Sequence, residues 1–270
     1  MDLFWEQKGD ASLGDLQCAI DLAEGAGKKL LQLRDRAGEL GLEGRDLKAA
    51  GDRTAQEFLA QSLHQLYPQD AVLSEEAVDD KRRLDSRRVW IIDPLDGTRE
   101  YSEFRDDWAV HVALWEDGEL SAGAVALPGL GLVLDSAEQG MPMAVGPARP
   151  WRIAVSRSRP PQIVHQLAQN ADVELVPMGS AGYKVCAVVR GEVDAYVHAG
   201  GQYEWDNAAP VGVCAAAGLH CSRLDGSPLV YNNEDTYLPD VLICRPELAD
   251  EILAQAAAFF GEHGSYQPED

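Results

Sequence analysis

The chain has 270 residues, of which 46% are hydrophobic, enough to build a continuous core in one large domain or two small ones. Lys and Arg total 23 whereas Asp and Glu total 45, so the formal net charge is −22. Such an acidic surface repels phosphate backbones and anionic lipids, which argues against a nucleic-acid polymer or a membrane as a partner. The chain has no run of eighteen apolar residues and no signal-peptide pattern at its start. We therefore expect a cytoplasmic protein.

The first half of the chain reads as helices packed on a sheet. Residues 15–33 and 52–66 carry apolar side chains at helical spacing, which predicts two amphipathic helices. Residues 71–76 and 89–94 are short apolar runs that end in acids, which is expected of buried strands whose ends face a polar site. Residues 108–136 alternate apolar runs with Asp-Gly and Pro-Gly turn signals, which indicates an antiparallel meander.

After the Gly- and Pro-rich segment 140–150, strands and helices alternate. Helices are expected near 162–169, at 180–189 and from about 207 to 217. We predict an α/β (α+β) sandwich with a weak boundary near residue 146, which divides one compact unit into 1–146 and 147–270. The five cysteines are scattered and never spaced as C-x-x-C, so we expect buried thiols rather than disulfides or zinc ligands.

Residues 89–101 read VWIIDPLDGTREY and place two carboxylates, Asp93 and Asp96, at the end of an apolar strand. Gly97 and Thr98 then begin a short helix whose free amides face the same place. The simpler interpretation is that Asp96 only caps this helix. Two acids this close repel each other, however, and a cation between them removes the conflict.

Three further acidic positions favour the cation. Glu75, beside Glu76, ends another apolar strand, while Asp206 and Asp52 lie at the starts of predicted helices. Oxygen ligands without His or Cys select Mg²⁺ or Mn²⁺, and Mg²⁺ typically also binds a substrate phosphate. The residues therefore predict a metal-assisted phosphate hydrolase. Residues 25–29 (GAGKK) and 179–182 (GSAG) match neither a P-loop nor a nucleophile elbow.

Three motifs together resemble the inositol monophosphatase family of lithium-sensitive, Mg²⁺-dependent phosphatases: SEE at 74–76, WIIDPLDGT at 90–98 and WDNAA at 205–209. The resemblance covers nearly the whole chain, and the second motif is very specific. It implies the layered α-β-α-β-α sandwich of inositol monophosphatase and fructose-1,6-bisphosphatase. It also implies two to three Mg²⁺ ions, with Mn²⁺ as an expected substitute.

The same resemblance implies which residues hold the metal. Glu75, Asp93 and the carbonyl of Leu95 would hold one ion, and Asp93, Asp96 and Asp206 would hold a second. Glu75 would also help to hold a third, weaker ion.

The resemblance further implies the catalytic residues. Asp52 would contact the waters of the third ion. Thr98, with Asp52 or Glu75, would position and deprotonate the attacking water, and the amides near Gly97 and Thr98 would receive the phosphate.

Within the family, DGTREY (96–101) and GSAGYKVC (179–186) are most similar to the CysQ branch. That similarity implies hydrolysis of the 3′-phosphate of 3′-phosphoadenosine 5′-phosphate, and of its sulfated precursor, in sulfate assimilation. A small-molecule phosphate ester, most simply an adenosine bisphosphate, is then the expected partner.

The pocket residues follow from the same similarity. Ser180, Tyr203 and Glu204, close to Asp206, would lie near the nucleoside, and Tyr203 is placed to stack on adenine. Lys184 would pair with the second phosphate, unless it is only a surface lysine.

Pro210 departs from the usual pattern of the branch. Because proline fits only the first turn of a helix, it predicts a helix that begins near Asp206 or Asn207.

Other functions stay open at this point. The same metal site would serve an inositol-1-phosphate or fructose-1,6-bisphosphate phosphatase. A non-catalytic, metal-dependent sensor of phosphate ligands is another class, although it would not need the water-activating set Thr98, Asp52 and Glu75. The sequence leaves a homodimer open.

Overall fold

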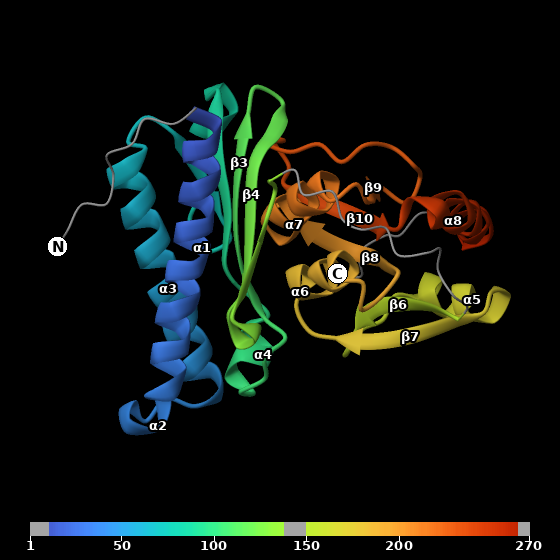
Figure 1. Cartoon of the computed structure of the whole chain (residues 1–270), viewed down its shortest axis with the longest axis horizontal. Coiled ribbons are helices and arrows are strands. Elements are labelled where there is room, and N and C mark those ends of the chain that lie inside the picture. Colours follow the sequence, from blue (N-terminus) through green and yellow to red (C-terminus); the bar gives the residue numbers. More distant parts are fainter. Residues whose placement is uncertain (1–10, 138–149, 264–270) are drawn as a thin grey trace.

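The computed structural model describes residues 11–137 and 150–263. Helical layers and sheets alternate across the molecule: a pair of long helices, a first sheet, a central pair of helices, a second sheet and outer helices (Figure 1). This arrangement confirms the predicted α-β-α-β-α sandwich. The predicted boundary at residue 146 lies outside the described residues, so the division into 1–146 and 147–270 stays a prediction.

The first sheet supplies the strand ends on which the predicted site is built. Its strands follow chain order: β1 (Ala71–Ser74), β2 (Arg88–Asp96), β3 (Ala109–Glu116), β4 (Glu119–Leu127) and β5 (Leu132–Asp135). β1 is parallel to β2, and every other pair in the sheet is antiparallel. The expected buried strands and the meander after residue 108 are therefore present.

Both faces of β2 are covered, which explains its continuous apolar run. Trp90 and Ile92 pack into the core beneath the long helices, whereas Val89 and Ile91 pack into the core of the central helices. Successive side chains of a strand point to opposite faces. A strand that is buried on both faces therefore cannot show the alternation of polar and apolar residues that half-buried strands show.

The long helices are α1 (Ala11–Asp35) and α3 (Gly44–Leu66), joined by the short α2 (Ala37–Leu40). α3 begins eight residues before the predicted range 52–66. The prediction missed these residues because two glycines, Gly44 and Gly51, interrupt the helical pattern in the sequence. A Cβ on Gly51 would lie 2.9 Å from both Leu95 and Tyr101. This glycine therefore lets α3 approach the end of β2.

The second sheet has the strand order β7-β6-β8-β10-β9. Its strands are β6 (Trp151–Ser156), β7 (Val173–Met178), β8 (Ala195–Tyr203), β9 (His220–Ser222) and β10 (Tyr237–Cys244). β6 runs parallel to β7 and β8, whereas β10 is antiparallel to β8 and β9. The sheet is therefore mixed.

Helices α6 and α7 fill the space between the sheets, and α5 and α8 cover the outer face of the second sheet (Figure 1). The helices are α4 (Thr98–Ser102), α5 (Gln162–Asn170), α6 (Ala181–Val189), α7 (Glu204–Ala216) and α8 (Ala249–His263). Short 3₁₀ turns are η1 (Arg82–Asp85), η2 (Pro128–Leu130) and η3 (Pro246–Leu248). One core contains residues of both sheets and of α6 and α7, so the central helices bind the two halves together.

The predicted start of α7 was wrong. The helix begins at Glu204, so Pro210 lies inside it rather than in its first turn. A proline here removes the amide that would otherwise donate to the carbonyl of Asp206 four residues earlier. The helix tolerates that loss because its buried face packs against the first sheet, and the sequence pattern alone does not contain this packing.

The remaining expectations concern membranes and thiols. In the described ranges, every helix is too short or too polar to cross a bilayer. All five cysteines are free thiols, and four of them, Cys18, Cys186, Cys214 and Cys244, are buried as predicted.

Candidate active site

β2 carries two predicted metal ligands where it leaves the sheet. Asp93 pairs with His111 of β3 and Asp96 pairs with Ala109, so β2 holds one extra residue in this interval. Residues three apart on a regular strand point to opposite faces, but a bulge re-aims them. Pro94, which has no amide for the sheet ladder, lies within the bulge. The two carboxylates therefore face one place, and their residues are 1% and 8% exposed.

α7 brings the third ligand from the other half of the chain. Asp206 lies in the first turn of this helix, where its Oδ2 accepts a hydrogen bond from the amide of Tyr203 at 2.6 Å. Asp93, Asp96 and Asp206 each offer one oxygen, and these oxygens lie within 4.8 Å of one another. The structure thus brings together side chains that are more than a hundred residues apart in the sequence.

Glu75 joins this group through the parallel pairing of β1 with β2. Ser74 is the register partner of Ile92, so the next residue along each chain, Glu75 after β1 and Asp93 within β2, lies at the same level. Glu75 as a residue is exposed, but its carboxylate shares a hydrogen bond with Asp93. Between two carboxylates such a bond needs a proton, or a cation in its place.

The crowding of negative charge shifts the titration of these groups. Burial raises the pKa of Glu75 to about 7, and the charge of Asp206 adds to the effect. Burial, together with the charge of Asp96, raises the pKa of Asp206 to about 6. The pKa of Asp93 lies well above its ordinary value because of burial and the charges of Glu75 and Asp96. The group therefore needs compensating positive charge at neutral pH.

Asp96 is the exception because donors surround it. Its Oδ2 accepts from Ser180 Oγ at 2.5 Å and from the amide of Gly182 at 2.6 Å, and its Oδ1 accepts from the amide of Ala181 at 3.1 Å. His111 Nε2 lies 3.2 Å from Oδ2. Burial alone would raise the pKa of Asp96, but His111 and Ser180 outweigh it and lower the pKa to about 2.

His111 is a residue whose contact with the site the sequence analysis missed. It is fully buried, its Nδ1 lies 3.0 Å from the carbonyl of Trp205, and Gly182 makes room for its ring. A Cβ on Gly182 would lie 2.0 Å from His111 Nε2. The available signal was a single polar residue inside the apolar run WAVHVALW, next to the strand that carries Asp93.

The predicted water-activating residues lie around the same strand end. Thr98 is the first residue of α4 and follows Gly97, whose φ of 90° is in the left-handed region that glycine tolerates. Asp52 lies on α3, and burial together with the charge of Glu76 raises its pKa to about 7. The amide of Leu95 donates to Asp93 Oδ1 at 3.0 Å, while the predicted ligand is the carbonyl of this residue.

Two predicted pocket residues have partners inside the protein. Ser180 donates to Asp96 and accepts from the amide of Tyr183 at 3.0 Å, so its hydroxyl is already used. Lys184 is 5% exposed and donates to the carbonyls of Gly179 and Ser180. The alternative that Lys184 is a surface residue was wrong. The structure favours a role in holding the turn before α6 over the predicted phosphate contact.

The other two pocket residues differ sharply in exposure. Tyr203 is 47% exposed, and its ring stacks on that of Trp205 with centroids 4.8 Å apart and planes 9° apart. Glu204 is fully buried, and its carboxylate accepts from Asn232 and Asn233. Tyr203 can therefore meet a ligand directly, whereas the structure gives Glu204 an internal role in place of the predicted contact with the nucleoside.

The donor set fits a hard divalent cation. The group consists of carboxylate oxygens, and its strongest counter-charges, His111 and Lys184, act on Asp96. Asp93 and Glu75 keep their mutual repulsion, which a divalent cation would relieve. The residues around this strand end can thus hold metal ions next to a hydroxyl side chain, Thr98.

The metal-free protein should lose stability as the pH rises. Glu75, Asp206 and Asp93 have raised pKa values, so between about pH 5 and pH 8 the folded state keeps protons that the unfolded state has released. Their stabilising contribution is complete below about pH 4, where the unfolded carboxyl groups are also protonated, and it is lost as the pH rises through the folded pKa values of about 6 and 7. We expect the melting temperature in EDTA to fall by several degrees from pH 5 to pH 8.

Saturation with a divalent cation should abolish much of this fall, because the cation replaces the protons. Thermal unfolding followed by circular dichroism measures it, with added NaCl as a control for the general surface charge. A metal-free protein that is equally stable at both pH values would contradict the assigned charge crowding.

Buried carboxylates that share divalent cations, beside a hydroxyl that can orient water, define the class of metal-dependent hydrolases of phosphate esters. The sequence profile of the inositol monophosphatase family matches residues 15–260, and the chain belongs to this family. The resemblance stated from the three motifs is thereby confirmed.

Relatives narrow the similarity further. A protein of Mycobacterium leprae named 3′-phosphoadenosine 5′-phosphate phosphatase is 52% identical over 256 residues, which are 90% of this chain and 93% of the relative. The 3′(2′),5′-bisphosphate nucleotidase CysQ of Escherichia coli O157:H7 is 30% identical over 83% of this chain and 96% of its own. The crystal structure of CysQ from Bacteroides thetaiotaomicron superimposes with a TM-score of 0.73 at 26% identity, over 86% of this chain and 97% of that one.

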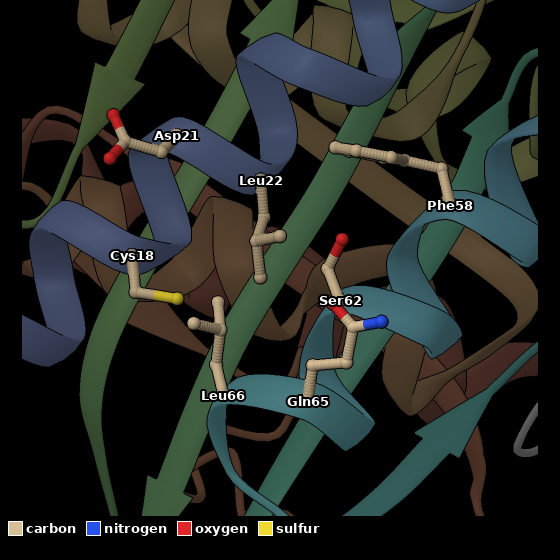
Figure 2. Close-up of a pocket in the computed structure, with 7 residues that line it drawn as sticks. All are labelled: Cys18, Asp21, Leu22, Phe58, Ser62, Gln65 and Leu66. Carbon is tan, nitrogen blue, oxygen red and sulfur yellow. The ribbon is translucent and has the colours of Figure 1, made fainter. Parts of the chain in front are cut away.

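A cavity of about 260 Å³ lies elsewhere, between α1 and α3. Figure 2 shows its lining, which includes Cys18, Leu22, Phe58 and Leu66 but no residue of the predicted site. It therefore has no part in the chemistry described above.

Proposed function

We propose that this protein is a Mg²⁺-dependent phosphatase that removes the 3′-phosphate of 3′-phosphoadenosine 5′-phosphate. The carboxylate group of Asp93, Asp96 and Asp206 carries the proposal, because it is a hard-oxygen site in a chain 52% identical to a phosphatase of that name. Carboxylate oxygens suit Mg²⁺, which keeps coordination positions for water and phosphate.

The family pattern, applied to this geometry, supports one set of metal ligands. Asp93 would contribute to two ions, the first shared with Glu75 and the carbonyl of Leu95, the second with Asp96 and Asp206. Bound Mg²⁺ lowers the pKa of a coordinated water and stabilises charge on the phosphate oxygens. Asp96, whose pKa of about 2 keeps it ionised, supplies a permanent negative charge.

Thr98, with Asp52 or Glu75, would orient the attacking water and take its proton. The raised pKa values of Asp52 and Glu75, about 7 each in the metal-free protein, suit groups that accept a proton near neutral pH. The amides of Gly97 and Thr98 would receive the phosphate.

Tyr203 would select the nucleoside. One face of its ring is covered by Trp205, and Tyr237 packs edge-on at 6.1 Å, so the ring is held at the surface beside Asp206. A rigid, half-exposed aromatic ring is a platform on which adenine can stack. Neither inositol phosphate nor fructose bisphosphate has an aromatic ring to use it.

We therefore expect Tyr203→Ala to raise KM for 3′-phosphoadenosine 5′-phosphate about tenfold, because stacking on a base contributes roughly 1–3 kcal/mol. The kcat value should change little. Tyr203→Phe keeps the ring and is the matched control, and hydrolysis of inositol 1-phosphate should respond equally weakly to both variants. Equal losses on both substrates after Tyr203→Ala would remove Tyr203 from the nucleoside pocket.

The proposed function is tested by phosphate release from 3′-phosphoadenosine 5′-phosphate, inositol 1-phosphate and fructose 1,6-bisphosphate, each with Mg²⁺ and with EDTA. The value of kcat/KM decides between substrates. We expect a strong, Mg²⁺-dependent preference for the nucleotide, and the sulfated precursor is the next compound to compare. A preference for a sugar phosphate would overturn the substrate assignment, and Mg²⁺-independent or absent turnover would overturn the phosphatase.

The proposal includes the metabolic pathway and the cellular location of this activity. Removal of a 3′-phosphate from an adenosine bisphosphate belongs to sulfate assimilation, which takes place in the cytoplasm. Lithium inhibition stays a prediction of the family resemblance, and a homodimer stays open.

A further inference from the structure

A buried arginine outside the carboxylate group connects two loops that are far apart in the sequence. Arg83, in η1, is 2% exposed, and its guanidinium donates to Asp79 Oδ2 at 2.9 and 3.1 Å. It also donates to Asn232 Oδ1 and to the carbonyl of Asn233, each at 2.7 Å. The side chain of Asn232 donates back to the carbonyl of Arg83 at 3.3 Å.

The same two asparagines hold Glu204. Its carboxylate accepts from the amides of Asn232 at 2.7 Å and Asn233 at 2.8 Å, and from Asn233 Nδ2 at 3.0 Å. Asn232 reaches this geometry with a φ of 63°, a left-handed conformation that asparagine tolerates better than most residues. We call these five residues, Asp79, Arg83, Asn232, Asn233 and Glu204, the Arg83–Glu204 network.

The two ends of the network lie next to predicted metal ligands. Asp79 belongs to the loop between β1 and η1, the loop that also carries Glu75. Glu204 is the first residue of α7, which carries Asp206 in the same turn, and its amide donates to the carbonyl of Thr236 at 2.9 Å. A hydrogen-bonded path from Asp79 to Glu204 thus joins the loop that carries Glu75 to the first turn of α7, which carries Asp206.

We propose that Arg83 is a positioning residue: through this network it holds Asp206 in register with Glu75. The proposal rests on the proposed function, because the register matters if these carboxylates share cations. Buried charges are costly, and well-packed apolar residues often replace them without loss of stability. A charged network therefore offers defined positions for its loops more than it offers stability.

The experiment compares Arg83→Lys with Arg88→Lys. Lysine keeps the charge at position 83 but loses the planar fork that reaches three partners at once. Arg88 is the matched control, because it lies at the far end of β2 and is held by Asp15, Asp70 and Glu116. Calorimetric titration with Mg²⁺ and thermal unfolding are measured on each purified variant, without substrate.

We expect Arg83→Lys to weaken Mg²⁺ binding about tenfold, the usual effect of losing a group that orients metal ligands. At saturating Mg²⁺ its kcat should approach that of the wild type. Arg88→Lys should lower the melting temperature and leave Mg²⁺ affinity unchanged. Asn233→Ala is a second variant: it removes the side-chain amide that donates to Glu204 and leaves Arg83 and the backbone contacts in place, so it should weaken Mg²⁺ binding by less than Arg83→Lys does.

A readout that needs neither metal nor substrate separates this proposal from the proposed function. Hydrogen exchange in EDTA should be faster at residues 203–208 in Arg83→Lys and unchanged there in Arg88→Lys. Wild-type Mg²⁺ affinity in both network variants, with turnover of the wild type intact, would overturn the network role alone. A wild-type chain that binds no Mg²⁺ would overturn the proposed function and this inference together.

Discussion

Asp93→Asn is expected to reduce kcat/KM for the nucleotide by about a thousandfold. Asp93 is the predicted ligand common to two cations, and metal ions stabilise the transition state of phosphate transfer by several kcal/mol, with each 1.4 kcal/mol worth a factor of ten. Its carboxylate is the most buried of the group, at 1% exposure. Calorimetric titration should show a matching loss of Mg²⁺ affinity.

The substitution tests charge rather than shape. Asparagine keeps an oxygen that can accept from the amide of Leu95, the contact that Asp93 Oδ1 makes at 3.0 Å. Because one of several repelling carboxylates is gone, the metal-free variant should melt no lower than the wild type. Asp194→Asn is the matched control: Asp194 is also buried but binds Arg152, and its loss should cost stability without changing Mg²⁺ affinity. Normal Mg²⁺ binding by Asp93→Asn would refute the metal centre.

The central carboxylates could be predicted from the sequence because their signal is local. Four apolar residues precede Asp93, and a proline and a glycine follow within four positions, so one short segment indicates both the end of the strand and the turn after it. Glu75 and Asp206 also lie where a regular element starts or ends. Elements with a clear pattern place such residues without knowledge of the whole fold.

The contacts of the site could not be predicted because they depend on pairs that are distant in the sequence. His111 reaches Asp96 only through the register of β3 with β2, and Arg83 meets Asn232 across 149 positions. Lys184 and Glu204 were assigned to the substrate from the resemblance to the CysQ branch, which contains no information on their burial in this chain. Burial favours internal partners for both, since a charged group inside the protein must find its partners there.

Thr98→Ala is expected to lower kcat by about a hundredfold while Mg²⁺ affinity stays as in the wild type. Positioned proton transfer contributes roughly 10² to 10⁴ to the rate of such reactions, and the hydroxyl of Thr98 is the group proposed to pass the proton of water to Asp52 or Glu75. Thr98 begins α4 two residues after Asp96, the last residue of β2, so its backbone is held close to the carboxylates. Single-turnover phosphate release measures the chemical step.

Thr98→Ser separates the hydroxyl from the methyl group, and it should keep most of the activity. Asp93→Asn and Thr98→Ala then separate metal binding from catalysis. Asp93→Asn should lose both Mg²⁺ affinity and turnover, whereas Thr98→Ala should keep Mg²⁺ affinity and lose turnover. If Thr98→Ala lost Mg²⁺ affinity to the same degree as Asp93→Asn, Thr98 would be a part of the metal centre. Proton transfer from the attacking water would then have to be assigned to Asp52 or Glu75 alone.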